Sequence, residues 1–340
     1  LPIDAVPDIT NIQVQINTQA MGFTAPEVEQ RITYPIETVM AGLPDLQQTR
    51  SMSRYGLSQV TVIFNEGTDI YWARQLISQR LQEARGELPT GVEPIMAPVS
   101  TGLGEIYHWV IKADKSALKP DGTPYSLTEL RELQDWVVRP QIRQVAGVAE
   151  VNSIGGYQKQ YVVEPNFSAM QRYGIGLQDL KQALETSNEN RGAGIISQQG
   201  QQLSVRVPGQ LSTISDIQQV VVQNSALGRA VLVSDVATVL LGQEIRSGAA
   251  TLNGQETVLG TAMMLTGANS RQVAHAVDAK IQQVQQSLPK GVLLETVYDR
   301  TTLVNKAIHT VQKNLLEGAL LVIAVLFLFL GNIRAALITA

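Results

Sequence analysis

Hydrophobic residues along the chain follow two spacings, one typical of strands and one typical of helices, in a fixed order. Apolar residues alternate over residues 12–18, which predicts a half-buried strand, and then recur every three or four positions over residues 24–40, which predicts a helix. Thr24 and Glu27 stand three apart at the start of that helix, the spacing of a capping box. Two further strands and a second helix are predicted at residues 46–52, 57–64 and 69–87.

The same order of elements returns later in the chain. The repeated elements are an extended segment at residues 107–113, a helix at 127–145, a strand that starts after Gly147 and a closing helix at 270–287. Both closing helices run into nearly identical turns, LPTGV at residues 88–92 and LPKGV at residues 288–292. This internal duplication predicts two βαβ-βαβ, ferredoxin-like units in an α+β fold.

The second of these units is interrupted. The sequence between Ile154 and Ser270 is far too long for a structureless loop in a compact domain, so an inserted mixed α/β domain is expected at residues 177–245. Its predicted elements are a helix at 177–186 and strands at 203–207, 220–222, 230–233 and 236–241. Residues 192–202, rich in Gly and Gln, have little to bury and are predicted to form a protruding, mobile arm.

The end of the chain is apolar on all sides. Residues 318–330 contain no polar side chain, and helical spacing of apolar residues already begins at Val304. A membrane-spanning helix needs roughly 20 apolar residues, so the strict run is short and a buried core helix is the alternative. The lack of a polar face favours the membrane. The lone Arg334 before a second apolar segment at 335–340 predicts a cytoplasmic turn, which puts the N-terminal portion on the outer face.

Composition narrows the classes of function. The 340 residues suffice for two or three domains, and a net charge of −4 without clustered Lys or Arg excludes a nucleic-acid-binding footprint. The chain has no cysteine, and therefore no disulfide and no thiolate metal site. It begins at Leu1 without a signal-peptide pattern, and we interpret it as a fragment of a longer membrane protein.

No catalytic set is recognisable in the sequence. His108, His275 and His309 lie far apart and outside any H-E-x-x-H spacing, and no phosphate-binding GxxxxGK[ST] segment occurs. We therefore expect neither an enzyme nor a bound cofactor.

Carboxylates are the better candidates for chemistry. Glu105 follows a glycine-rich turn at the start of a predicted strand, and Glu150 lies where a helix turns into the next strand. As neighbouring strands, these would project both carboxylates from one sheet surface, where they suit a divalent cation such as Zn²⁺ in competition with protons. The alternative is two solvated surface glutamates. His108, three residues after Glu105, is expected on the opposite side of the strand, as a surface or interface residue.

Methionine content bears on the choice of metal. Soft thioether ligands select Cu(I), whereas carboxylate and imidazole suit Zn²⁺ and similar ions. Among the seven methionines only Met263 and Met264 are adjacent, and on a strand they point to opposite faces. Core packing accounts for most of the methionines, which favours a divalent cation over copper or silver.

Several long segments resemble one known family. The segments LPIDAVPDIT, RITYPIETVMAGLP, SRYGLSQVTVIF, STGLGEIYHW, YDRTTLV and FLFLGNIRAALI are similar to those of the CzcA-type, heavy-metal efflux branch of the resistance-nodulation-division (RND) transporters. The resemblance covers the whole chain as the first periplasmic loop plus the second transmembrane helix. The implied parts are porter subdomain 1 (1–104), porter subdomain 2 (105–176 and 246–300), a docking subdomain (177–245), a transmembrane helix with a short cytoplasmic turn (301–334) and the start of the next transmembrane helix (335–340).

The resemblance also implies a function. The complete protein would be a proton-driven homotrimeric pump in the bacterial inner membrane, embedded in lipid, with residues up to about 300 in the periplasm. It would export Zn²⁺, Co²⁺ or Cd²⁺ as substrate, together with a periplasmic membrane-fusion adaptor and an outer-membrane channel. Its metal ligands would include Glu105 and Glu150, although Asp is usual at the second position. The alternatives are a pump for Cu(I)/Ag(I) or organic compounds, and a membrane-tethered interaction module that does not transport.

The expected trimer also predicts where particular residues lie. In the family the first repeat faces the threefold axis, which implies that Tyr34, Met40, Leu43 and residues 50–56 lie at or near the pore. The arm at residues 192–202 would reach a neighbouring subunit or the docking funnel.

Overall fold

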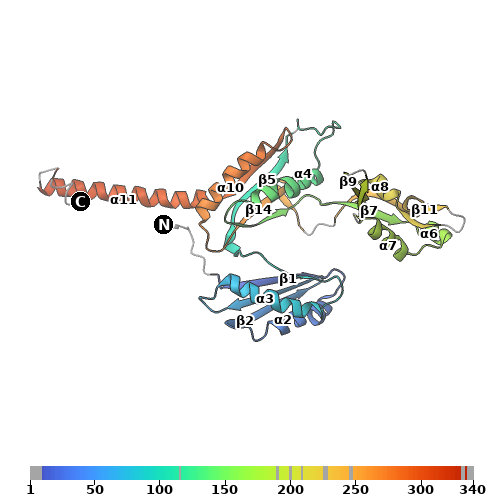
Figure 1. The fold of residues 1–340 in the computed structure, drawn as a ribbon. Coiled ribbons are helices and arrows are strands. Elements are labelled where there is room, and N and C mark those ends of the chain that lie inside the picture. Colours follow the sequence, from blue (N-terminus) through green and yellow to red (C-terminus); the bar gives the residue numbers. More distant parts are fainter. Residues whose placement is uncertain are drawn as a thin grey trace. The chain divides into compact units, whose positions relative to one another are not determined.

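A computed structural model of the chain describes residues 10–114, 116–188, 191–198, 201–207, 210–224, 229–244, 248–330 and 334. The chain divides into two compact units (Figure 1). The first unit contains residues 1–125, 133–155 and 250–340, and the second contains residues 126–132 and 156–249. The first unit holds both predicted repeats except for residues 126–132, which include most of the first helical segment of the second repeat, and each unit is described by itself.

The first repeat is a four-stranded antiparallel sheet with the order β2-β3-β1-β4. This is the strand order of a ferredoxin-like fold, as the duplication predicts. Its elements are β1 (Gln13–Gln19), α1 (Ala25–Val28), α2 (Tyr34–Met40), β2 (Leu46–Arg54), β3 (Leu57–Phe64), α3 (Ile70–Arg85) and β4 (Pro94–Met96). The capping box is confirmed, because the Thr24 amide donates to Glu27 Oε2 at 2.8 Å and this bond lowers the pKa of the exposed Glu27 carboxyl.

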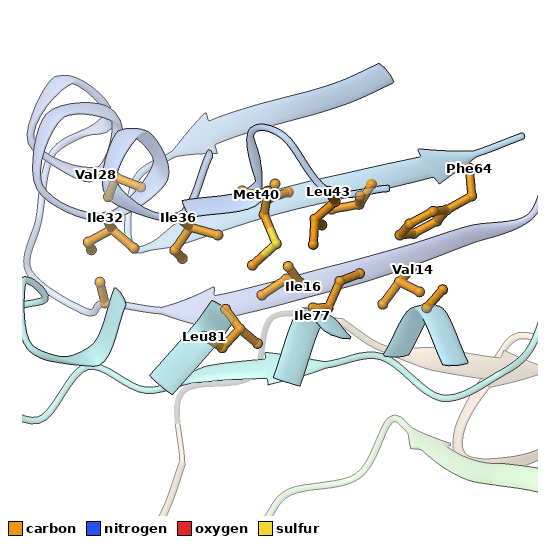
Figure 2. Packing of buried hydrophobic residues seen from close by; sticks show 14 residues of the cluster. Val14, Ile16, Val28, Ile32, Ile36, Met40, Leu43, Phe64, Ile77 and Leu81 are labelled. Carbon is orange, nitrogen blue, oxygen red and sulfur yellow. The ribbon is translucent and has the colours of Figure 1, made fainter. Parts of the chain in front are cut away.

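One apolar cluster fills the first repeat. Figure 2 shows Ile32, Ile36 and Met40 in a row on one helix, facing Ile16 of β1 and Ile77 of α3. Each fully buried side chain of this size contributes about 1.5–3 kcal/mol through removal of apolar surface from water. Met40 and Leu43 are buried in this cluster, and their place at or near the pore of a trimer stays a prediction. Tyr34 is exposed, and its place at the pore stays a prediction.

Each repeat has a π-helical turn in its first helix, directly before an X-Pro pair. The turns are Glu29–Thr33, before Tyr34-Pro35, and Gln134–Val138, before Arg139-Pro140. Proline has no amide hydrogen to donate and its ring crowds the carbonyl four residues back, and a π turn accommodates both. The shared irregularity supports the duplication independently of the LPTGV and LPKGV turns.

The second repeat has the same topology. Its sheet runs β6-β14-β5-β15, all antiparallel, with β13 as an additional partner of β14. Its elements are β5 (Glu105–Ala113), α4 (Leu127–Leu133), α5 (Arg139–Arg143), β6 (Val148–Ile154), β13 (Ala250–Leu252), β14 (Gln255–Met264), α10 (Ser270–Gln285) and β15 (Val292–Asp299). A short 3₁₀ turn, Gly102–Gly104, precedes β5.

Side-chain hydrogen bonds cross the core of this second repeat. Trp109 Nε1 donates to Gln134 Oε1 at 2.9 Å, and both side chains are buried. The Tyr107 hydroxyl donates to Asp278 Oδ1 at 2.6 Å and lies 2.7 Å from Thr296 Oγ1. Burial, and secondly the bond to Asp278, raise the pKa of the Tyr107 phenol far above its ordinary value. The helices are thereby fixed to the sheet by specific polar contacts as well as by packing.

The second unit is a separate mixed α/β domain with its own apolar core. Its elements are β7 (Lys159–Pro165), α6 (Phe167–Tyr173), α7 (Leu177–Ser187), β8 (Arg191–Gln198), β9 (Gln201–Val207), α8 (Ile214–Gln218), β10 (Val221–Asn224), β11 (Ala230–Leu232), α9 (Val233–Val236) and β12 (Ala237–Gln243). β7 pairs with β12 along its whole length, so this domain takes up the chain from residue 156 rather than from residue 177. Residue 156 carries no detectable boundary signal because β7 continues the strand-rich pattern after β6.

Strands β8 and β9 form an antiparallel pair in the segment predicted to be an arm. The segment is therefore a two-stranded hairpin, whereas its protrusion, its mobility and its contact with a neighbouring subunit stay predictions.

The chain enters and leaves the inserted domain at adjacent points of the second repeat. Gly155, at φ +79°, ends β6, and a side chain there would lie 2.4 Å from the Thr257 carbonyl oxygen and 2.9 Å from the Ala250 amide nitrogen. Only glycine allows both the left-handed backbone and this close approach.

Helix α11 (Arg300–Leu330) contains a segment, Arg300–Phe329, that is long and apolar enough to cross a membrane by length and composition. Large apolar side chains such as Leu315, Leu320 and Phe329 are exposed, unlike those of a core helix. A single helix of this kind does not by itself place a protein in a membrane. The predicted second apolar segment, 335–340, lies outside the described residues.

Candidate functional site

Glu105 and Glu150 lie on strands that are not neighbours. Strand β14 separates β5 from β6, and Met263 of β14 is the register partner of Glu105 on one side and of Glu150 on the other. The expectation of adjacent strands is wrong, because in the ferredoxin-like order the third strand inserts between the first two. The two glutamates nevertheless occupy one row across the sheet, about 10 Å apart at two strand spacings.

A β-bulge places Glu105 beside His108. Tyr107 pairs with Ala262 and Glu105 pairs with Met263, so Ile106 is an extra residue that has no partner on β14. In a regular strand, residues three apart point to opposite faces, but a bulge reverses the alternation. Glu105 Oε2 accordingly lies 3.5 Å from His108 Nε2, and the expectation that they face opposite sides is wrong.

The imidazole of His108 is held on its other side by an aromatic ring. Its centroid lies 5.0 Å from that of Tyr298 on β15, with the rings tilted by 56°. Nε2 is buried and has no hydrogen-bond partner among the described residues. Burial lowers the pKa of His108, although the nearby Glu105 charge opposes this effect, so the neutral imidazole is favoured.

Glu150 is held by two arginines. Its carboxylate lies 3.3 Å from Arg139 Nη2 and 3.5 Å from Arg143 Nη2, and also accepts from the Val151 amide at 3.1 Å. Arg139 and Arg143 are four residues apart on α5 and therefore reach the same carboxylate. Only 18% of the Glu150 side chain is exposed, against 51% for Glu105. The carboxylates thus have different partners and do not form a shared pair.

One further polar contact involves Met263, the register partner of both glutamates, and was missed in the sequence. Asn152 Nδ2 donates to Met263 Sδ at 3.1 Å, and this contact occupies the thioether. The i, i+4 spacing of Arg139 and Arg143 was a detectable signal, whereas the place of Met263 depends on the strand order. Among the described residues no cluster of three or more His, Asp or Glu side chains could hold a metal ion. Any site here therefore needs ligands from elsewhere.

Comparison with known proteins agrees with this architecture. The family model described as "AcrB/AcrD/AcrF family" matches residues 1–340. The cobalt-zinc-cadmium resistance protein CzcA of Cupriavidus metallidurans is 60% identical over 340 residues, which are 100% of this chain and 32% of that protein. The nickel-cobalt-cadmium resistance protein NccA of Alcaligenes xylosoxydans xylosoxydans is 47% identical over 364 residues, with 100% of this chain and 34% of that protein covered.

More distant similarity extends to another cation pump and to solved structures. The cation efflux system protein CusA of Escherichia coli K12 is 38% identical over 338 residues, covering 99% of this chain and 32% of that protein. An X-ray crystal structure of a heavy metal efflux pump, crystal form II, superimposes with a TM-score of 0.87 at 36% identity, covering 99% of this chain and 33% of that one.

The chain thus spans about a third of the length of the relatives that it matches. The solved heavy metal efflux pump shares the fold of this chain over 99% of the chain's length. The family match and the resemblance read from the sequence agree. The chain belongs to the AcrB/AcrD/AcrF family, in its CzcA-type heavy-metal efflux branch.

Proposed function

We propose that the protein containing this chain is a proton-driven trimeric pump that exports divalent heavy-metal cations, with Zn²⁺, Co²⁺ and Cd²⁺ as the substrate class. The observation that carries this proposal is the 60% identity over all 340 residues with a cobalt-zinc-cadmium resistance protein. The 38% identity with CusA is much lower, so a different metal class is the weaker candidate. The relatives do not favour an organic-compound pump or a module that does not transport.

Helix α11 is proposed to cross the bacterial inner membrane, with the residues before Arg300 in the periplasm. The pump would deliver its substrate through a periplasmic adaptor and an outer-membrane channel. Exposed apolar side chains along α11 support contact with lipid, because water would oppose so continuous an apolar surface.

Glu105 and Glu150 are proposed to form half of the cation site, completed by ligands outside this chain. Glu105 is open to solvent, and its one partner at salt-bridge distance among the described residues is His108. Glu150 has to exchange its two arginine partners for the cation, which weakens its binding. Weak binding suits an exporter, since it must release what it captures.

The experiment is tolerance of zinc and cobalt in cells that carry the full-length pump with Glu105→Gln, Glu150→Gln or both changes. These near-isosteric changes remove charge without opening a cavity, so we expect reduced tolerance at normal membrane levels of the pump. Glu66→Gln, at an exposed loop position of the first repeat, is the matched control and should retain tolerance. Undiminished tolerance with both changes combined would place the cation path elsewhere.

A further inference from the structure

We propose that His108 is a ligand of the transported cation through Nε2, and that His108 and Glu105 form a two-ligand clip on β5. The class of cation rests on the proposed function, whereas the clip itself rests on the geometry of the second repeat. Neither the spacing in the sequence nor a regular strand would bring these two side chains together.

The separation of the two donor atoms fits a bound ion. Zn²⁺ binds His nitrogen at about 2.0–2.1 Å and carboxylate oxygen at about 2.0–2.2 Å, and a tetrahedral angle then places the two atoms about 3.4 Å apart. Nε2 of His108 and Oε2 of Glu105 are 3.5 Å apart. A cation can therefore enter between them with little rearrangement.

The Nε2 atom of His108 has no other use in the described structure. It is buried and lacks a hydrogen-bond partner among the described residues, a state that native proteins rarely leave without a reason. The 3.5 Å approach of Glu105 is within ion-pair range but does not satisfy the nitrogen. A neutral imidazole nitrogen with a free lone pair is a common metal ligand, and cation binding would supply the missing partner.

The surroundings of His108 and Glu105 let an ion approach and hold the two side chains in position. The His108 Nε2 atom itself is buried, but Glu105 beside it keeps 51% of its side chain exposed, so an ion reaches the nitrogen by way of the carboxylate. The Tyr298 ring packs against the imidazole, and the bulge at Ile106 directs Glu105 to the same side. In contrast, His275 and His309 are exposed on helices α10 and α11 and lack a carboxylate partner at salt-bridge distance among the described residues.

The test uses the whole 340-residue chain in detergent and follows Zn²⁺ binding by calorimetry at one fixed pH. Two protein ligands bind weakly, and we expect His108→Gln and Glu105→Gln each to lower the Zn²⁺ affinity by about tenfold or more. His275→Gln is the matched control, because it removes an imidazole of the same chemistry from an exposed helix position, and it should bind as the wild type does.

A measurement on the unmutated chain covers the case in which His108→Gln fails to fold. Addition of Co²⁺ should produce paramagnetic shifts of the His108 ring resonances, and these should exceed any shifts of His275 and His309. Wild-type affinity in a folded His108→Gln chain, unshifted His108 resonances, or no Zn²⁺ bound by the wild-type chain would each overturn the clip. The proposed pump would survive all three results, because its own test is metal tolerance in cells.

Discussion

The two repeats share one strand order but stabilise it differently. The first repeat packs a continuous apolar cluster, in which Ile16, Ile36 and Ile77 are fully buried. Its buried side-chain hydrogen bond joins two small hydroxyl groups, those of Thr33 and Ser58, at 2.7 Å. The second repeat places an indole, a carboxamide, a phenol and a carboxylate in its interior contacts. One topology therefore tolerates two kinds of core.

The difference between the two cores correlates with how the second and third strands of each repeat are connected. In the first repeat β2 and β3 join through a tight turn at Gly56, with φ +69°, and this turn sets their register. In the second repeat the inserted domain replaces that turn, so the turn cannot set the register. Trp109, Gln134 and Tyr107 supply specific side-chain bonds instead. Specific side-chain hydrogen bonds in the core therefore occur in the repeat whose second and third strands are not joined by a tight turn.

The largest expected effect tests the apolar core of the first repeat. Ile36→Ala removes a fully buried side chain and leaves a cavity, which should lower the local stability of the first repeat by about 2–5 kcal/mol. Hydrogen exchange of amides in α3 and β1 should report this loss, while amides in β5 and α10 stay unchanged. Ile95→Ala, at a position that is 66% exposed, is the control and should cost little. Equal losses in both repeats would mean that they unfold as one cooperative body.

A smaller effect tests the polar contacts of the second repeat. Tyr107→Phe keeps the ring but removes the hydroxyl that donates to Asp278, and a hydrogen bond to a charged group contributes about 1.5–3 kcal/mol. Exchange should accelerate in β5 and α10. Tyr34→Phe removes an exposed hydroxyl from the first repeat and should leave exchange unaltered. If Tyr107→Phe also proves neutral, the polar contacts do not stabilise this repeat.

The smallest expected effect is a pH dependence of stability that is confined to the second repeat. Burial lowers the pKa of His108 below its ordinary 6.5, so the unfolded chain binds the proton first as the pH falls. The stability that the neutral imidazole contributes is complete above about pH 6.5 and declines below it. In the metal-free chain, acidification from pH 7.5 to 5.5 should therefore destabilise the second repeat less in His108→Gln than in the wild type. The first repeat contains no histidine and should show no difference between the two chains.

The sequence was sufficient for the fold because its signals were local and repeated. Alternation in β1, helical spacing in α3 and the paired turns after α3 and α10 are properties of short segments, and the observed elements lie close to the predicted ranges. The start of the inserted domain could not be predicted from such local signals. Strand β7 pairs with the distant β12, and no local feature of residues 159–165 distinguishes this partner from β6.

The candidate site was only partly predictable for the same reason. Glu105 and Glu150 were identified as candidates from their positions beside turns, but their spacing depends on β14, which comes more than one hundred residues after β6. The bulge that turns Glu105 toward His108 arises from the pairing with β14, and the arginine contacts of Glu150 arise from packing of α5. Contacts created by tertiary pairing leave no period in the sequence.

The close approach of Gly155 to Ala250 has an evolutionary consequence. Because the chain departs and returns at one spot, a gene segment encoding the whole inserted domain could enter or leave in a single event. The remaining strands would need only a short turn, such as the one at Gly56 in the first repeat, to close the gap. On this argument the duplication joined two uninterrupted ferredoxin-like units, and the second unit acquired its inserted domain at Gly155.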